Sequence, residues 1–342
     1  MFNPKYTVTN KLLGNIKRIA EIVTELNSRN FSSMVLVEMQ RRAREISAYS
    51  STGIEGNPLP LADVKKILKN SPAHVRDSER EVLNYNQALI ELDEMIRKRE
   101  VVFNIDLLQQ IQKTITAGLI AKNRWGNIRQ EPVFVNDPQT RQTVYLPPEH
   151  TDVIPLLEEM FSFLEKNAKE IDPLILAGIF HKQFVIIHPF IDGNGRTARL
   201  ATKALLAKMG LDTFNLFSFE NYYNQNVTKY FEEVGVLGNY YDLKDKIDFT
   251  SWLEYFTDGI IDELLRVKKE MEKETTTPDE ALKEYHHKIL NYIRENGFIT
   301  DREYSKLTKR ARPTRNLDFR KLIDLGLIVK EGKGKATYYK FK

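Results

Sequence analysis

The chain has no cysteine among its 342 residues, which excludes disulfide bonds, thiolate metal sites and a cysteine nucleophile. Cysteine-free chains suit a reducing compartment, so we expect a cytoplasmic location. Long apolar runs are also lacking, because no stretch approaches the roughly 18 residues that a membrane-spanning helix needs. The first five residues do not resemble the start of a signal peptide. The composition therefore predicts no membrane partner.

Charge is nearly balanced overall, with a net of +4, but it is unevenly placed. Residues 281–342 hold 16 Lys and Arg against 7 Asp and Glu, a net of +9, which leaves −5 for residues 1–280. A length of 342 residues, at about 150 residues per domain, predicts two or three domains. A basic C-terminal domain attached to a mildly acidic remainder of the chain indicates two functions, one of them on an anionic partner.

The first half of the chain is predicted to be helical, because apolar residues recur there with a period near 3.6. The expected helices cover residues 10–26, 33–50, 61–68, 77–97, 104–118 and 152–167. We therefore expect a mainly α fold.

One segment, residues 129–146, breaks this helical pattern. Two short β-branched and aromatic runs, 133–135 and 143–146, flank the turn formers Asn136-Asp137-Pro138, which predicts a β-hairpin. The two prolines that follow end the second strand. The hairpin is either a decoration or a flap over a functional site.

The composition changes after residue 270, where Glu, Lys and Thr replace apolar residues. We therefore expect a linker over 271–281. The other expected divisions are an N-terminal helical region over 1–100, a core over 101–270 and a C-terminal domain over 282–342.

The C-terminal domain is predicted to be a winged helix-turn-helix, because three short helices precede a hairpin. Thr300 and Glu303 have capping-box spacing, and Pro313 is suited to the first turn of a helix. The expected elements are helices over 285–295, from Thr300, and from Pro313 to Gly326, followed by strands over 327–329 and 336–341.

The densest group of chemically capable residues is the run His188-Pro189-Phe190-Ile191-Asp192-Gly193-Asn194-Gly195-Arg196-Thr197-Ala198-Arg199. Its Asp-Gly-Asn-Gly stretch predicts a tight loop that opens a helix over 197–209. Unpaired N–H groups at a helix N-terminus bind anions. Arg196 and Arg199 share one helical face and can hold the same phosphate chain. The run therefore indicates a site for a phosphorylated ligand.

Two further residues of the run suit catalysis on such a ligand. Asp192 offers hard oxygen ligands for Mg²⁺, and His188 titrates near neutrality and can accept a proton. Each residue alone also has a structural interpretation: a buried histidine, a turn or a solvated arginine. Their combination within twelve residues favours function. A Walker phosphate loop is excluded, because the Gly-Lys-Ser/Thr ending is missing.

The run resembles the motif of the Fic family, His-Pro-Phe-x-Asp/Glu-Gly-Asn-Gly-Arg-x-x-Arg, at every fixed position. The similarity extends over about residues 30–260. It implies an all-helical Fic core with a β-hairpin flap, and transfer of AMP from ATP to a Ser, Thr or Tyr hydroxyl of a target protein or of the chain itself. A glycine at 195, where phosphorylating relatives have lysine, favours nucleotidyl transfer. A C-terminal winged helix is a recurrent companion of this core.

The resemblance implies a role for each matching residue. His188 would be the general base, and Asp192 would hold Mg²⁺ on the phosphates. The remaining implied ligand contacts are the phosphate loop Gly193, Asn194 and Gly195, the β- and γ-phosphate arginines Arg196 and Arg199, and the adenine-side Tyr230. The resemblance also implies that Thr143, Val144 and Tyr145 lie in the flap, which registers the target chain by strand addition.

A second run, Ser51-Thr52-Gly53-Ile54-Glu55-Gly56-Asn57, resembles the inhibitory motif of the same family, Ser/Thr-x-x-x-Glu-Gly/Asn. The resemblance implies that Glu55, supported by Ser51 and Gly56, pairs with Arg199 and displaces the γ-phosphate. In some relatives the same glutamate positions water for AMP removal. The structural interpretation is a helix end with Glu55 in solvent.

Other functions stay open from the sequence. Basic residues on or before the third C-terminal helix, and on the wing, favour DNA binding, although basic winged helices also bind proteins. These residues are Arg310, Arg312, Arg315, Arg320, Lys321, Lys333 and Lys335. Rival readings of the whole chain are a DNA-binding regulator whose Fic core senses nucleotide, and a transferase that uses UTP or another phosphodiester donor. Relatives often dimerise, so a homodimer is a further expectation.

Overall fold

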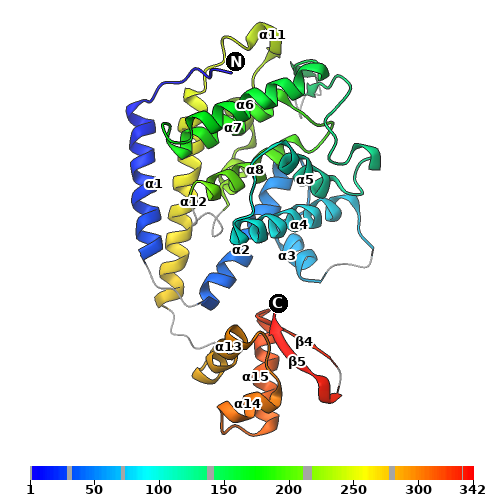
Figure 1. Cartoon of the computed structure of the whole chain (residues 1–342), viewed down its shortest axis with the longest axis vertical. Coiled ribbons are helices and arrows are strands. Elements are labelled where there is room, and N and C mark those ends of the chain that lie inside the picture. Colours follow the sequence, from blue (N-terminus) through cyan, green and yellow to red (C-terminus); the bar gives the residue numbers. More distant parts are fainter. Residues whose placement is uncertain are drawn as a thin grey trace. The chain divides into compact units, whose positions relative to one another are not determined.

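The computed structural model of the chain describes residues 2–28, 33–70, 74–136, 142–210, 218–276, 282–332 and 334–342. The chain divides into two compact units (Figure 1). One unit comprises Met1–Asn30 and Met39–Lys268, and the other comprises Phe31–Glu38 and Lys269–Lys342. Most of the described residues are helical, which confirms the expected mainly α fold. No helix in the described part of the chain is long and apolar enough to cross a membrane.

Five helices open the chain, and all of them were predicted by periodicity. They are α1 (Asn10–Ser28), α2 (Ser33–Ile54), α3 (Leu61–Asn70), α4 (Asp77–Lys98) and α5 (Ile105–Thr116). Helix α2 continues four residues beyond the predicted end at residue 50, so that Glu55 directly follows its last turn. Gly56 ends this helix with a φ of +92°, a left-handed conformation that favours glycine.

A wholly buried helix lies at the centre of the first unit. In α7 (Pro173–Ile187) every residue except Pro173 and Val185 is buried, because the segment is apolar on all sides. Asp172 caps its start by accepting a hydrogen bond from the Leu174 N–H. The other helices of this region are α6 (Val153–Asn167), α8 (Asn194–Lys208), α9 (Phe219–Gln225), α10 (Val227–Val234), α11 (Tyr240–Leu243) and α12 (Thr250–Thr276), with short 3₁₀ turns at Lys122–Arg124 and His150–Asp152.

The predicted hairpin is present in the described residues. β1 (Val135–Asn136) pairs antiparallel with β2 (Thr143–Leu146), while Asp137 and Pro138 of the predicted turn lie outside the described residues. The sheet gains a third strand, β3 (Gly238–Asn239), which runs parallel to β2. The sequence did not predict β3, since two residues that include a glycine carry no strand pattern.

The second unit contains the predicted order of three helices and a hairpin. Its elements are α13 (Glu284–Asn296), α14 (Asp301–Leu307), α15 (Arg312–Asp324), β4 (Ile328–Glu331), a 3₁₀ turn at Gly334–Ala336, and β5 (Tyr338–Phe341). Thr300 forms the predicted capping box with Glu303. The ring of Phe319 stacks on Tyr339 at 3.9 Å, which joins α15 to the hairpin in one small core.

The predicted divisions differ from these units in two places. Helix α12 continues to Thr276, so the first six residues of the predicted linker 271–281 are helical, and 277–281 lie outside the described residues. Glu, Lys and Thr lack apolar surface, but Glu and Lys are good helix formers. Residues 1–30 and 39–100 belong to the same unit as the core, in which α4 packs against α5 and α8, whereas Phe31–Glu38 are assigned to the other unit.

Candidate active site

His188 follows the last residue of α7 in a left-handed conformation, with a φ of +52°. Its Nδ1 lies 3.1 Å from the carbonyl oxygen of Val185, an acceptor, so Nδ1 carries the ring proton. This tautomer leaves Nε2 with a free lone pair. Burial lowers the pKa of the ring below its ordinary 6.5. At neutral pH, His188 is therefore an uncharged imidazole that can accept a proton.

The loop after His188 leads into the N-terminus of α8, with Gly193 as the N-cap residue. Asn194 holds the loop, because its side chain accepts from the Phe190 N–H and donates to the Phe190 carbonyl. The first N–H groups of α8 have no acceptor within the helix. A Cβ at Gly195 would collide with Oε1 of Glu55. A carboxylate therefore lies directly against the backbone at which a phosphate would bind.

Arg196 is held between two carboxylates. Its Nη1 lies 2.6 Å from Oε1 of Glu81 on α4, and its Nη2 lies 3.0 Å from Oδ1 of Asp192. Glu81 also accepts a hydrogen bond from the Asn57 side chain, just after the inhibitory motif. Burial raises the pKa of the Glu81 carboxyl, and Arg196 partly offsets this effect. The sequence analysis missed Glu81, because a single glutamate on a helix with many charged residues does not indicate that it pairs with Arg196, 115 residues away.

Arg199 is completely buried, and four groups surround its guanidinium. Nε donates to the Ser51 hydroxyl at 2.7 Å, and Nη2 donates to the Ser51 carbonyl at 2.9 Å. Nη2 also lies 2.7 Å from Oε1 of Glu55. Nη1 donates to the Tyr230 hydroxyl at 3.3 Å. The expected pairing of Glu55 with Arg199, supported by Ser51, is thus present in the structure.

The Glu55 carboxylate is ionised in this arrangement. Burial alone would raise its pKa, but the nearby charges of Arg199 and Arg196 outweigh burial and hold the pKa below its ordinary value. The Glu55 side chain keeps 29% of its surface exposed, while that of Arg199 has none. A group that approached from solvent would therefore meet Glu55 before Arg199.

A buried polar network holds the neighbouring turn of α2. Glu220, on α9, is fully buried and accepts hydrogen bonds from Ser47 at 3.0 Å and Tyr85 at 2.9 Å. Lys203, on α8, lies 3.2 Å from the same carboxylate oxygen. Ser47 stands one turn before Ser51, so the network fixes the face of α2 that meets Arg199.

Asp192 satisfies the requirements of a magnesium ligand. Its Oδ1 accepts from the Gly193 N–H and from Arg196, and Oδ2 has no partner among the described residues. The side chain is 45% exposed. Mg²⁺ is commonly held by one or two carboxylates together with phosphate oxygens and water. The described residues contain no cluster of three His, Asp or Glu, so a nucleotide would have to supply the other ligands.

The side chains of two tyrosines in the implied set are buried. Tyr145 lies in the hairpin, as the resemblance implied, and its hydroxyl donates to the Ile186 carbonyl at 2.9 Å, so its side chain anchors the hairpin to α7. Tyr230 is 1% exposed and stacks on Tyr223, with centroids 4.7 Å apart. Its hydroxyl accepts a hydrogen bond from Arg199 at 3.3 Å, and a contact with adenine stays a prediction.

The other two flap residues remain accessible. Thr143 is exposed and Val144 is half-buried, and the Thr143 hydroxyl donates to Asn136 across the hairpin at 2.9 Å. Among the described residues, β3 pairs with Tyr145 and Leu146, and no strand pairs with the same edge of β2 at Thr143 and Val144.

The sequence analysis also missed Arg129. Its side chain is almost fully buried and donates to main-chain carbonyls on both sides of the hairpin and at the end of α7. A residue whose partners are main-chain oxygens leaves no pattern in the sequence.

Several predicted DNA-contacting residues are engaged within the second unit. Arg310 pairs with the buried Asp318 and lies 3.6 Å from the centroid of the Tyr285 ring. Arg315 donates two hydrogen bonds to Asp301. The exposed face of α15 contains Arg312, Asn316, Leu317 and Arg320, and Lys321 is half-buried beside it. Lys333 lies outside the described residues, as does the side chain of Lys335.

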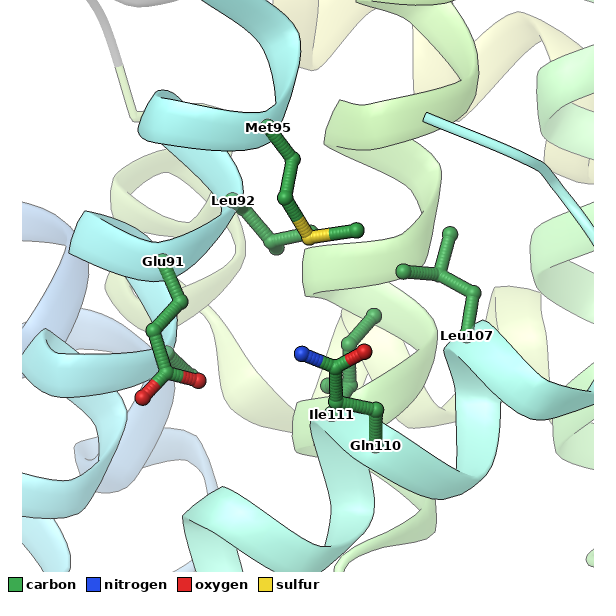
Figure 2. Close-up of a pocket in the computed structure, with 7 residues that line it drawn as sticks. Glu91, Leu92, Met95, Leu107, Gln110 and Ile111 are labelled. Atoms are coloured by element: carbon green, nitrogen blue, oxygen red, sulfur yellow. The ribbon is translucent and has the colours of Figure 1, made fainter. Parts of the chain in front are cut away.

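A shallow pocket lies between α4 and α5 (Figure 2). Its lining is mainly apolar and includes Leu92, Met95, Leu107 and Ile111, with the polar ends of Glu91 and Gln110 at its rim (Figure 2). None of the residues of the two sequence motifs lines it. We assign it no chemistry.

Comparisons with known proteins agree with the motif. The segment 102–206 matches the model of the Fic/DOC family. Two curated relatives are the proteins named "Protein adenylyltransferase Fic" of Drosophila willistoni and Aedes aegypti, at 27% and 28% identity over 228 residues. Each alignment covers 61% of this chain and 43% of the relative. The chain thus spans less than half the length of these relatives.

Solved structures share the fold. A Fic family protein from Desulfovibrio desulfuricans G20 has a TM-score of 0.67 at 19% identity, covering 100% of this chain and 98% of that chain. A Fic domain containing signaling protein from Bacteroides thetaiotaomicron VPI-5482 has a TM-score of 0.59 at 19% identity, covering 75% and 96%. The motif and the family match thus agree on a similarity to the Fic/DOC family over residues 102–206, and the solved structures share the fold.

Proposed function

We propose that this chain is a Mg²⁺-dependent protein adenylyltransferase that is inhibited by its own Glu55. The observation that carries the proposal is the arrangement around the N-terminus of α8, where a neutral His188, Arg196 and Arg199 surround a short loop. The curated relatives bear the name of the same activity. The acceptor would be a Ser, Thr or Tyr hydroxyl of another protein, or of the chain itself.

The proposed reaction is a displacement at the α-phosphorus of ATP. His188 Nε2 takes the proton of the acceptor hydroxyl as the hydroxyl oxygen bonds to the α-phosphorus. The bond from that phosphorus to the oxygen bridging to the β-phosphate breaks, and pyrophosphate leaves with the electron pair. A Mg²⁺ ion at Asp192 would supply charge neutralisation at the phosphates. Catalysis of this kind rests on positioning and charge stabilisation.

The two arginines would neutralise most of the negative charge of ATP that Mg²⁺ leaves. ATP carries about four negative charges, and the guanidinium groups match phosphate oxygens in pairs. Arg196 would bind the β-phosphate and Arg199 the γ-phosphate. Both now contact carboxylates, which supports the idea that an anion belongs at each of them.

Inhibition follows from competition for Arg199. While Glu55 contacts Arg199 and lies against Gly195, a γ-phosphate would meet a like charge at the same place. ATP would then bind with its α-phosphorus out of line for the acceptor. The charged carboxylate also leaves room for a reverse activity, in which Glu55 orients water for AMP removal.

The direct test is the intact mass of the protein after incubation with ATP and Mg²⁺. We expect an adenylyl adduct on Glu55→Gly, little on the natural chain, and none on the double variant Glu55→Gly/His188→Ala. Parallel incubations with UTP and other nucleotides identify the donor. No adduct on a folded Glu55→Gly protein with any nucleotide would contradict transfer to the chain itself. An adduct that survives loss of His188 would contradict its role as general base.

A second candidate function, DNA binding, is favoured by the exposed face of α15. Arg312, Asn316 and Arg320 recur at four-residue spacing, with Leu317 beside them and 62% exposed. Arginine and asparagine are the side chains that read base edges in the major groove, and an apolar side chain can contact the thymine methyl. Arg310 and Arg315 would act inside the unit and not on DNA.

A titration of labelled duplex DNA at several salt concentrations tests this function. We expect the natural chain to bind with an affinity that falls as salt rises, and Arg320→Gln to weaken binding to the preferred duplex more than to other duplexes, because Arg320 would read a base edge. The matched control is Lys288→Gln, which removes an exposed cation from α13 that pairs with Glu284. Absence of salt-dependent binding in the natural chain would favour a protein partner.

A further inference from the structure

Arg129 joins three segments of main chain around the candidate active site. It lies between α5 and the hairpin and is only 3% exposed. Its Nη1 donates to the Glu131 carbonyl at 3.2 Å, before β1, and Nη2 donates to the Pro148 carbonyl, after β2. Its Nε donates to the carbonyl of His188 at 2.8 Å. One guanidinium therefore connects both ends of the hairpin to the histidine.

The main chain at His188 depends on this contact. His188 is one of two described non-glycine residues with a positive φ, a conformation that persists only where surrounding contacts enforce it. The Arg129 N–H adds a second tie by donating to the Pro189 carbonyl at 3.0 Å. These bonds hold the loop in the conformation that presents Nε2.

Arg129 is unusual because it is a buried charged side chain whose hydrogen-bond partners are main-chain carbonyl oxygens. Charged groups are rarely buried without a carboxylate partner, and here burial lowers the pKa of Arg129. An apolar residue could fill the space at lower cost, but it could not bridge three carbonyls. The Tyr145 hydroxyl, by comparison, makes one hydrogen bond between the hairpin and the Ile186 carbonyl.

We propose that Arg129 is a positioning residue for AMP transfer, which sets the acceptor-binding hairpin and the His188 ring in one fixed geometry. The inference rests on the proposed function. Arg129 makes no hydrogen bond with the phosphate loop in the described structure, so its loss affects the chemical step more than nucleotide binding.

Arg129 also acts on the charge state of His188. The charged groups that act on this ring are Arg129 before the hairpin, Glu55 at the end of α2 and Asp192 in the loop. Burial is the main cause of the lowered His188 pKa, and the positive charge of Arg129 lowers it further, while Glu55 and Asp192 raise it. Loss of Arg129 should therefore raise the His188 pKa.

The test places Arg129→Met and Arg129→Lys in the Glu55→Gly chain and measures self-labelling from ATP against ATP concentration and pH. We expect Arg129→Met to lower the saturating rate at least tenfold, with little change in the half-saturating ATP concentration, and to move the acid limb of the pH profile upward. Arg129→Lys keeps the positive charge but cannot bridge the three carbonyls. We therefore expect its acid limb to match that of the Glu55→Gly parent, while its saturating rate stays as low as that of Arg129→Met.

Two control variants separate positioning from general loosening. Tyr145→Phe removes an uncharged tie of the same hairpin, so we expect a lower rate with an unmoved acid limb. Arg124→Met removes the surface pair of Arg124 with the Glu131 side chain and should change neither quantity. Unchanged rate and acid limb in both folded Arg129 variants would overturn the proposal.

An NMR titration of the His188 ring gives a readout that needs no turnover. We expect the pKa of His188 to be higher in the Arg129→Met variant than in the Glu55→Gly parent, and to equal the parent's value in the Arg129→Lys variant. If the Glu55→Gly parent forms no adduct but this titration behaves as stated, the proposed function fails while the coupling of Arg129 to His188 stands. If the parent is active and the His188 pKa is the same in all three proteins, the coupling is wrong.

Discussion

The two units contain the same chemical contact, a carboxylate paired with an arginine, in two different settings. In the first unit, Glu55 and Arg199 lie 144 residues apart in sequence, and their side chains are 29% and 0% exposed. In the second unit, Asp318 and Arg310 lie eight residues apart, and the exposure is reversed, at 4% for the acid and 28% for the arginine.

This reversal separates an exchangeable contact from a structural one. In the first unit the arginine is fixed by Ser51 and Tyr230 and the carboxylate lies on the solvent side, which is the arrangement that the proposed exchange for a phosphate requires. In the second unit the carboxylate is the fixed centre, since Asp318 also accepts a hydrogen bond from Tyr304 at 2.8 Å. Its removal would leave the core of that unit without its polar partner.

The largest expected effect is on the stability of the second unit. We expect Asp318→Asn to lower its free energy of unfolding by about 3 kcal/mol, because Arg310 loses a buried counter-charge. Hydrogen exchange of the α13 and α15 amides in the full chain measures this change. Self-labelling in the Glu55→Gly background should be unaffected, and a parallel loss of labelling would contradict the division into an exchangeable and a structural pair.

The second effect is on activity. Glu55→Gln keeps the size of the side chain and removes its charge, so Arg199 becomes available to a phosphate. We expect self-labelling to rise about tenfold, equivalent to roughly 1.4 kcal/mol, with a melting temperature near that of the natural chain. A large fall in stability with no gain in labelling would make Glu55 a structural residue like Asp318.

The smallest effect is a predicted insensitivity to pH. The Glu55 pKa is depressed, so its stabilising contact is complete above the ordinary value of 4.5 and is lost only as pH falls through the lower folded value. The ratio of labelling rates between Glu55→Gly and the natural chain should therefore stay constant from about pH 6 to 8. Convergence of the two rates on moving to pH 6 would show that the carboxylate titrates near neutrality.

Much of this architecture could be predicted because its signals are local. Helical periodicity located α1 to α5, and capping and turn residues located the elements of the second unit. The run from His188 to Arg199 predicted one site, and the structure does bring these residues together. Glu55 was found through its motif, although periodicity alone ended α2 five residues before it.

The rest depends on partners that are distant in sequence or belong to the main chain. Glu81 and Glu220 act through side chains on other helices, and Arg129 acts through carbonyl oxygens, so none has a sequence pattern. The burial of the Tyr145 and Tyr230 side chains, which pack against α7 and Arg199, could not be predicted from the resemblance, and their ligand contacts stay predictions. Whether the chain dimerises, binds DNA or lies in the cytoplasm remains a prediction from sequence.

The central claim is that Arg199 exchanges the Glu55 carboxylate for a nucleotide phosphate. A crystal structure of the Glu55→Gly protein with ATP and Mg²⁺ tests it most directly. We expect the Arg199 guanidinium to contact the γ-phosphate while it keeps Ser51 and Tyr230, with Asp192 on the metal. A triphosphate bound away from Arg199, or an empty loop at Gly193–Gly195 with the ligand at saturating concentration, would contradict the account.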